Sequence, residues 1–421
     1  MPWVVVVLLG AGAILTVRTG FVQVRRFGEA WRVALVRRSP DGTGALTPFQ
    51  AFMTALGASI GTGNIAGVAT AIVSGGPGAL FWIWVYGFVA TAIKFAEAVL
   101  GMTFRETRGD TVLSGPMYYL RDGLRSPALA WIFALVAAVA ALTTTPFSQP
   151  NSMALVLHSV FGIRPLVSGV VIAVLTWLVI IGGISSIGRA AEKLSPLKVG
   201  LYLAGGLVVI GFNLTRIPAV LSQVVSEAFT TRSALGFGMF AAMRYGIARG
   251  VYANEAGYGT AAVAYGTARS AQPTLQGLNA VVEVFVVSFV TSTISAMTIL
   301  LTGVWQSGVT STAAVAAGFN TVMPTFGGWI VAFCTFLFGY TTLIGWAYYG
   351  EQFFEYILGR AVTRPYRWIY CLLIPFGAIS KVDLVWAWGD LMNALQVFPN
   401  LIGVIGLSGI VGAAARERLK K

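Results

Sequence analysis

The stretch GASIGTGNIAGVA, residues 57–69, lies inside an apolar run and contains four glycines together with a serine, a threonine and an asparagine. Each glycine costs about 1 kcal/mol relative to alanine in a helix interior. The glycines form pairs spaced four residues apart, so one interpretation is a close helix–helix contact through small residues. The other is an interruption of the helix near residues 61–64, where freed backbone groups can bind a ligand.

The composition around this stretch determines the class of protein. The chain has 421 residues, of which 57% are hydrophobic and 10% charged, and its mean hydropathy is +0.79. These values exclude a soluble domain and indicate a polytopic membrane protein. The two cysteines, Cys334 and Cys371, lie in apolar segments and form no CxxC metal motif or disulfide framework.

Apolar runs recur along the whole chain, and a helix requires about 20 apolar residues to cross a membrane. We therefore predict an all-α polytopic protein with about eleven transmembrane helices. The predicted spans are residues 3–17, 45–74, 79–104, 128–160, 165–187, 195–213, 236–266, 277–304, 327–358, 366–380 and a last, kinked span over 384–414.

The net charge of +13 is concentrated in short segments between these spans, which indicates membrane topology and not nucleic-acid binding. The arginines after the first span place that loop in the cytoplasm and the N-terminus outside, so the C-terminus is cytoplasmic. The basic residues on the predicted cytoplasmic side are Arg18, Arg25, Arg26, Arg32, Arg37, Arg38, Arg105, Arg108, Arg189, Lys193, Lys198, Arg360, Arg364, Arg367 and the terminal RERLKK.

A second interrupted span follows five helices later, in RGVYANEAGYGTAA, residues 249–262. Two broken helices, each opening a set of five, are typical of transporters with the LeuT fold and its inverted repeats. We predict an extra N-terminal helix and basic loop over residues 1–44, a first five-helix repeat over 45–230 and a second over 231–421.

Six motifs in both halves resemble those of the alanine or glycine:cation symporter family, also called sodium:alanine symporters. The motifs are GTGNIAGVATAIVSGGPGALFWIWV, KFAEAVLG, GPMYYL, RGVYANEAGYGTA, LFGYTTLIGWAYYGE and DLMNALQVFPNLIGVIGLSG. The resemblance implies sodium-driven uptake of a small neutral amino acid, alanine or glycine, by alternating access across a prokaryotic plasma (inner) membrane. It implies Na⁺ as the coupling ion, with no organic cofactor, nucleic acid or obligate protein partner.

An amino acid zwitterion requires donors for its carboxylate and acceptors for its ammonium group, and unwound backbone supplies both. We expect Thr62 and Gly63 to bind the carboxylate, and the resemblance places the ammonium at carbonyls near residues 253–257. The predicted substrate-binding residues are Thr62, Gly63, Asn64, Gln149, Asn254, Ala256, Gly257, Thr342 and Trp346.

Some of these residues have a second interpretation. Gln149, with Asn151, binds substrate or only holds the Pro150 kink open. Trp346 shares a helix face with Thr342 and either caps a small substrate side chain or packs against lipid and protein.

Three intramembrane carboxylates need an explanation, because such groups are functional by default. Glu255 lies in the second broken span, where it either serves the site or pairs with a neighbouring arginine, Arg249 or Arg244. Glu97 follows Lys94 by three residues, which favours a local ion pair. Glu283 lies near the start of its span, where we expect it to face the cytoplasm.

Sodium prefers oxygen ligands. The resemblance implies a sodium ion between the first broken helix and the eighth core helix, held by the carbonyls of Gly57, Ile60 and Phe338 and the hydroxyls of Thr341 and Thr342. In the alternative interpretation, both threonines donate to carbonyls one turn earlier in their own helix.

The chain departs from the family pattern at three places. Val287 stands where the family has an aspartate, TAAVAYG follows the second break, and TTTPF replaces a usual Gly-Asn pair. The first helix also begins later than in the family pattern, which is expected of a shortened or a divergent member.

These departures leave alternative functions open, whereas the absence of catalytic motifs excludes another. A transporter of another small solute, or one driven by protons, is the nearest alternative, and a channel or receptor-like binding protein is less favoured. An enzyme is excluded, because the sequence has one histidine and no HExxH motif.

Overall fold

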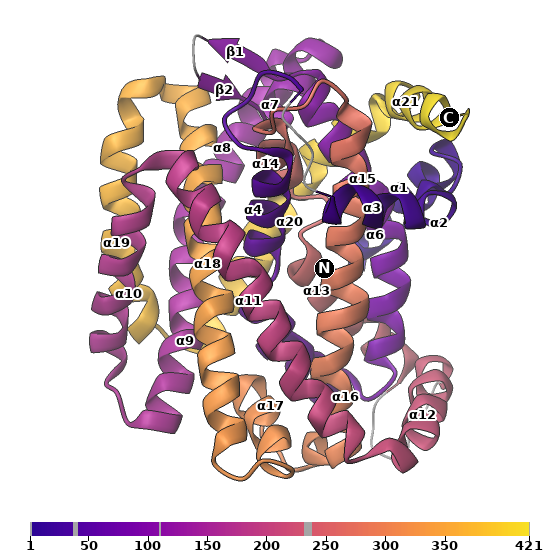
Figure 1. Ribbon diagram of the computed structural model, residues 1–421, viewed down its shortest axis with the longest axis vertical. Helices are drawn as coiled ribbons and strands as arrows, with labels where there is room; N and C mark the ends of the chain where they lie inside the picture. The colour runs from indigo at the N-terminus through magenta and orange to yellow at the C-terminus, as the bar shows by residue number, and fades with distance from the viewer. Residues whose placement is uncertain (1, 37–40, 109–110, 231–237, 421) are drawn as a thin grey trace.

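The computed structural model describes residues 2–36, 41–108, 111–230 and 238–420. Arg37, Arg38, Lys421 and the first residues of the predicted span 236–266 lie outside these ranges. The described residues form a bundle of helices with one short antiparallel pair of strands, β1 (Glu106–Arg108) and β2 (Thr111–Leu113) (Figure 1). The predicted all-α class is confirmed.

The first half of the chain contains the helices that lead into and follow the first break. They are α1 (Pro2–Arg18), α2 (Val22–Arg25), α3 (Phe27–Leu35), α4 (Pro48–Ser59), η1 (Thr62–Asn64), α5 (Ala66–Gly75), α6 (Ala79–Thr103), α7 (Pro116–Tyr118), η2 (Tyr119–Gly123), α8 (Pro127–Thr143), α9 (Thr145–Phe161), α10 (Pro165–Ile180), α11 (Gly183–Gly211), η3 (Leu214–Arg216) and α12 (Ile217–Phe229).

The second half begins at the second break. Its helices are α13 (Met239–Asn254), α14 (Thr260–Gly266), α15 (Pro273–Val284), η4 (Phe285–Thr291), α16 (Ser292–Thr302), η5 (Val304–Gln306), α17 (Ser311–Asn320), α18 (Phe326–Leu358), η6 (Arg360–Val362), α19 (Thr363–Ile379), α20 (Val382–Gly406) and α21 (Ser408–Lys420).

Among the described residues, five helices are long and apolar enough to cross a membrane, or up to seven when each sharply bent pair is one span. One bent pair is α20 with α21, which meet at 58° as the predicted kink requires. Helices α1 and α10 are apolar but shorter. The protein is therefore multi-pass, and the number of about eleven spans stays a prediction.

One pair of predicted spans has the wrong boundaries. The spans 165–187 and 195–213 correspond to α10, which ends at Ile180, and to α11, which begins at Gly183. The basic segment between them is the first part of α11, because its alanine, arginine, glutamate and lysine residues are good helix formers. Lys198 consequently lies in the middle of a long helix and not near the start of one.

The first break is confirmed. Helix α4 begins with a capping box between Thr47 and Gln50 and ends at Ser59, and the following segment to Gly75 is bent from it by 58°. The close-contact interpretation also holds for Gly57, because a Cβ atom there would lie 2.6 Å from Ser195 Oγ of α11. The same glycine-rich stretch therefore packs closely against a neighbour and unwinds.

The second break is confirmed between α13 and α14. Glu255 has a φ of 57°, and Gly257 and Gly259 have φ values of 95° and 80°. Such left-handed conformations are inexpensive only for glycine. A Cβ atom on Gly259 would also lie 2.2 Å from Pro116 Cγ, so glycine is required there for space as well.

The two breaks lie next to each other within the bundle. Helix α13 packs against α5 and η1, and α14 packs against α4, while α6 contacts α13, α14 and α15. The hairpin β1–β2, α7 and α21 lie at one end of the molecule, and α12 and α17 lie at the opposite end (Figure 1). Basic residues predicted as cytoplasmic, including Arg105, Arg108 and Arg416, thus lie at one end.

Candidate functional site

A small cavity separates the two breaks. It has a volume of about 20 Å³, which is roughly enough for one water molecule. The bundle is therefore closed around the site. The lining residues are Ala58, Ser59, Gly61, Gly63, Thr144, Thr145, Gln149, Tyr252, Glu255, Tyr258, Thr342, Trp346 and Asn393.

The first break forms one wall, and its glycines allow other helices to approach. A Cβ atom on Gly61 would lie 2.7 Å from Thr342 Oγ1 and 3.1 Å from Gln149 Oε1. A Cβ atom on Gly63 would lie 2.7 Å from Tyr252 Cδ1. The glycines at this wall consequently let the side chains of Thr342, Gln149 and Tyr252 lie directly against the backbone of the break.

Gln149 lies against the same wall. Its Oε1 accepts the backbone N–H of Thr62 at 3.0 Å, and the hydroxyl of Thr62 is buried without a partner among the described residues. Asn151 instead donates to the carbonyls of Gly377 and Ser380 and so holds α19 against α9. Of the two amides in this helix, the structure brings only Gln149 to the cavity.

Asn64 does not line the cavity, because its amide group holds the first break in place. Its Nδ2 donates to the Ser59 carbonyl at 3.2 Å, and its Oδ1 accepts the hydroxyls of Thr291 and Ser292, each at 3.3 Å. These bonds tie the unwound turn to η4 and α16.

Asn254 has the same function at the second break. Its Oδ1 accepts the Ala256 N–H at 3.0 Å, and its Nδ2 donates to Ser288 Oγ at 3.1 Å. The carbonyl of Ala256 accepts the hydroxyl of Tyr86 at 3.0 Å. Asn254 and Ala256 therefore have protein partners and lie behind the cavity wall.

Glu97 supports the second break from α6 and does not form the expected pair with Lys94. Its Oε1 accepts the N–H groups of Gly257 and Gly259 at 2.9 and 3.1 Å and the Nδ2 of Asn400 at 2.7 Å. The carbonyl of Gly257 also accepts Asn400 Nδ2, at 2.8 Å. The predicted substrate ligand Gly257 is therefore bonded to protein on both sides of its backbone.

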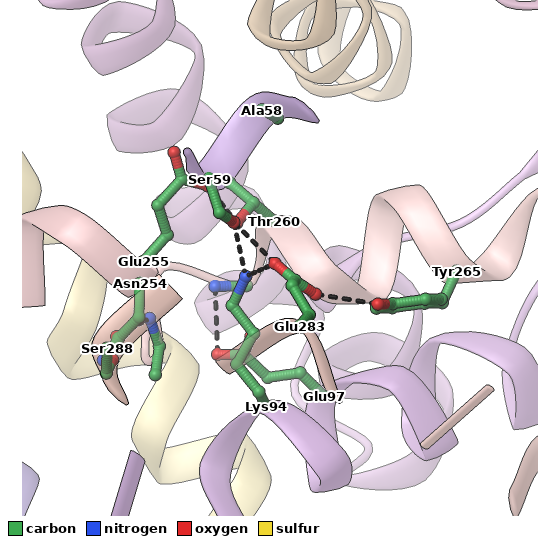
Figure 2. A network of polar contacts seen from close by, with 12 residues as sticks. Ala58, Ser59, Lys94, Glu97, Asn254, Glu255, Thr260, Tyr265, Glu283 and Ser288 are labelled. Atoms are coloured by element: carbon green, nitrogen blue, oxygen red, sulfur yellow. Dashed lines mark hydrogen bonds and ion pairs between the residues drawn. The ribbon is translucent and has the colours of Figure 1, made fainter. Parts of the chain in front are cut away.

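Lys94 pairs with Glu283, which the sequence placed at the cytoplasmic surface. Their Nζ and Oε1 atoms are 2.5 Å apart, and both groups are about 1% exposed. Figure 2 shows the ammonium group between Glu283 and Ser59, whose Oγ is 2.9 Å from Nζ, while Tyr265 donates to the other carboxylate oxygen at 2.8 Å. This pair fastens the end of α4 to α6 and α15.

Glu255 lines the cavity and does not pair with either neighbouring arginine. Its Oε1 accepts Trp346 Nε1 at 2.6 Å, and its Oε2 accepts the Thr260 hydroxyl at 2.9 Å. Arg249 instead forms an ion pair with Asp390, at 2.5 Å. The arginine-pairing interpretation is wrong, and among the described residues the Glu255 carboxylate is hydrogen-bonded by neutral groups.

The predicted sodium ligands do come together, but they surround a lysine. Lys198 is fully buried, and its Nζ lies 2.9 Å from the Gly57 carbonyl, 2.6 Å from the Ile60 carbonyl and 2.5 Å from Thr341 Oγ1. The expectation that Lys198 faces the cytoplasm is wrong. The ammonium group occupies the position where sodium was expected.

The other two members of that predicted set make bonds within the protein. Thr342 Oγ1 of α18 donates to the Ala58 carbonyl near the end of α4, at 2.7 Å. The Phe338 carbonyl lies 3.2 Å from Thr341 Oγ1, which is also 3.0 Å from the Leu337 carbonyl. Thr341 thus makes the backbone bonds of the alternative interpretation in addition to its contact with Lys198.

Comparison with known protein families gives a match over the whole chain. The model of the sodium:alanine symporter family matches residues 1–421. The chain belongs to this family. It is therefore a transporter and not an enzyme, and the resemblance carried by its six motifs is confirmed.

Two relatives indicate how far this family assignment extends. The chain is 39% identical over 420 residues to the sodium/alanine symporter AgcS of Methanococcus maripaludis, covering 97% of this chain and 92% of the relative. It is 32% identical over 415 residues to the probable sodium/glutamine symporter GlnT of Bacillus subtilis, covering 98% and 87%. Cation-coupled amino acid transport is common to these names, whereas the amino acid differs.

Comparison with solved structures identifies the fold. The transporter MhsT in complex with L-phenylalanine matches with a TM-score of 0.60 at 13% sequence identity, covering 87% of this chain and 99% of that one. This likeness confirms the LeuT-like fold of the symporter, including the discontinuous helices predicted from its glycine-rich stretches.

The symporter has a large hollow at one end of the bundle and packed side chains on another side of the small cavity. A hollow of about 1080 Å³ lies at the end that carries β2 and is lined by residues 42–45, 182–185 and part of 360–367, with Tyr348 of α18. On another side of the site, Arg249 pairs with Asp390 and Tyr252 packs on Trp386 with ring centroids 4.9 Å apart. The hollow thus lies at the end predicted to be cytoplasmic.

Proposed function

We propose that this symporter couples inward sodium movement to the uptake of a small neutral amino acid, alanine or glycine. The observation that best supports this proposal is the cavity between the two breaks, which is lined by glycine backbone, by Trp346 and by the Glu255 carboxylate. Its walls are already in contact, so the smallest amino acids require the least displacement. The names of the relatives support sodium as the coupling ion.

The substrate carboxylate binds at the first break, where Thr62 and Gly63 supply N–H donors and Gln149 moves aside from the Thr62 N–H. The ammonium group binds Glu255, a residue outside the predicted ligand set, because a buried carboxylate gains most from a cationic partner. Trp346 holds Glu255 in position and covers the substrate side chain. Thr342 completes the wall behind Gly61.

Four predicted ligands act indirectly in this scheme. Asn64 and Asn254 position the two breaks through the bonds described above. Ala256 and Gly257 position the second break through their bonds with Tyr86 and Glu97. The set Gly57, Ile60, Phe338, Thr341 and Thr342 is not assigned to sodium, because Lys198 occupies its centre.

Transport proceeds by alternating access between two five-helix repeats, residues 45–230 and 231–421, with 1–44 as an extra helix and loop. The broken first helix of each repeat supports this division. The N-terminus lies outside and the C-terminus in the cytoplasm of a prokaryotic cell, in agreement with the clustering of basic residues at one end. Opening to the cytoplasm then extends the large hollow past Trp346, on the same helix as Tyr348.

Uptake of labelled alanine into proteoliposomes tests the proposal, with an inward sodium gradient, a proton gradient or neither. We expect accumulation only with sodium, and competition by glycine but not by glutamine or phenylalanine. Accumulation driven by protons alone would assign the rival coupling. Flux that only equilibrates alanine would indicate a channel, and competition by glutamine alone would assign another substrate.

A further inference from the structure

The oxygen cluster around Lys198 has the features of a cation site. Helix α4 ends at Ser59, and the N–H groups that would continue its ladder are diverted: Gly61 N–H donates to the Ser59 carbonyl, and Asn64 N–H donates to the Gly61 carbonyl. The carbonyls of Gly57 and Ile60 are consequently left to accept from Lys198. Carbonyls at a helix C-terminus favour positive charge.

The lysine is fixed in this cluster by its own helix. Ser195, one turn earlier on α11, donates to the Met53 carbonyl at 2.9 Å and lies where a side chain on residue 57 would collide. The ring of Phe338 lies 5.2 Å from Nζ, and its face favours a cation. Helices α4, α11 and α18 thus hold the ammonium group at one point.

The charge of the cluster leaves no place for a second cation. The three atoms that contact Nζ are two carbonyl oxygens and one hydroxyl oxygen, all neutral. One ammonium group therefore satisfies the cluster, and a sodium ion beside it would meet a like charge at close range. Sodium could take the same oxygens only if the lysine left them.

We propose that Lys198 is the resident cation of the site between α4 and α18, in the place of one coupling sodium ion, so that any sodium the symporter carries binds elsewhere. The experiment counts bound ions, and its outcome is therefore separate from the proposed transport of alanine. Absent alanine uptake would contradict the proposed function and leave the sodium count meaningful.

The test measures binding of ²²Na⁺ to the purified full chain, with the number of ions per protein and the apparent affinity. We compare wild type, Thr341→Val, Lys198→Ala and the double variant. Thr335→Val, a substitution in the same helix away from the cluster, is the control for the valine change. Lys193→Ala, an exposed lysine of α11, is the control for loss of charge.

We expect Thr341→Val to leave the sodium count and affinity as in wild type and in Thr335→Val. We expect Lys198→Ala to bind one additional sodium ion, and the double variant to lose it. The proposal is overturned if Thr341→Val, with Lys198 in place, lowers sodium affinity about tenfold or more. It is also overturned if folded Lys198→Ala gains no sodium.

If Lys198→Ala does not fold, the Thr341→Val comparison decides alone, because it keeps the lysine. Monodisperse elution and a cooperative melting transition establish that this variant is folded. Wild-type sodium binding that does not depend on the Thr341 hydroxyl supports the proposal, and binding that does depend on it contradicts the proposal.

Discussion

The two helix breaks are stabilised by fixed charges of opposite sign. At the first break, the carbonyls of Gly57 and Ile60 accept from the Lys198 ammonium, and Lys94 donates to the Ser59 hydroxyl. At the second, backbone N–H groups of Gly257 and Gly259 donate to the Glu97 carboxylate. Each charge matches the backbone groups that its break exposes.

This difference explains how irregular backbone is tolerated inside a membrane. Unwound turns leave carbonyls at the end of one half-helix and N–H groups before the next, and lipid satisfies neither. In this chain the buried Lys198 ammonium binds the free carbonyls, and the buried Glu97 carboxylate binds the free N–H groups. Gly61, Gly63 and Glu255 remain at the surface of the cavity between them.

The largest expected effect follows from removing the cation that supports the first break through Ser59. Lys94→Met leaves the Glu283 carboxylate buried without its partner, which costs about 3–5 kcal/mol. We expect a large loss of thermal stability in detergent. Lys94→Met with Glu283→Leu should recover much of that stability, and a double variant as unstable as the single would contradict the ion-pair account.

A smaller effect is expected at the second break. Glu97→Gln weakens the charge-assisted acceptor of two N–H groups and should cost about 1.5–3 kcal/mol. Glu355→Gln, a half-buried carboxylate near the end of α18, is the matched control. Melting temperatures of the two variants measure the difference, and equal values would remove the proposed role of Glu97.

Trp346→Phe keeps an aromatic ring at the cavity and removes the N–H that holds Glu255. We expect the KM for alanine to rise about fivefold to tenfold, equivalent to about 1–1.4 kcal/mol, with little change in melting temperature. Initial uptake rates over a range of alanine concentrations measure this. An unchanged KM would show that Glu255 needs no orienting donor.

The smallest effect is expected far from both breaks, at the surface. Hydrogen bonds from Arg121 lower the pKa of Asp122 below its ordinary value. A depressed carboxyl pKa adds stability above the unfolded pKa of about 3.9, and this stability is lost as the pH falls through the lower, folded value. Asp122→Asn should therefore reduce thermal stability slightly at pH 7 and leave it unchanged at strongly acidic pH, in melting scans at both.

The sequence predicted the two breaks because their glycine and asparagine residues interrupt apolar runs at matching places in the two halves. It also identified two side chains at the first break, since Thr342 lies in a motif of the family and the resemblance places Gln149 beside the site. The kink before α21 followed from local pattern as well.

Other features depend on contacts that local pattern does not specify. Lys198 contacts Gly57, Ile60 and Thr341, which all lie at least 138 residues from it in the chain. The available signal was a lysine directly before the apolar run VGLYLAGG, near the start of the predicted span 195–213, where the sequence predicts that it faces the cytoplasm. The partnership of Lys94 with Glu283 was missed for the same reason, because the nearer Glu97 satisfied the helical spacing.

The most direct test of the central claim is the affinity for alanine of Glu255→Gln, measured by binding to purified protein at saturating sodium. The account predicts an affinity at least about tenfold weaker than wild type, with an unchanged melting temperature, because the ammonium group loses its buried carboxylate. An unchanged affinity in a folded variant would contradict the placement of the substrate between the two breaks.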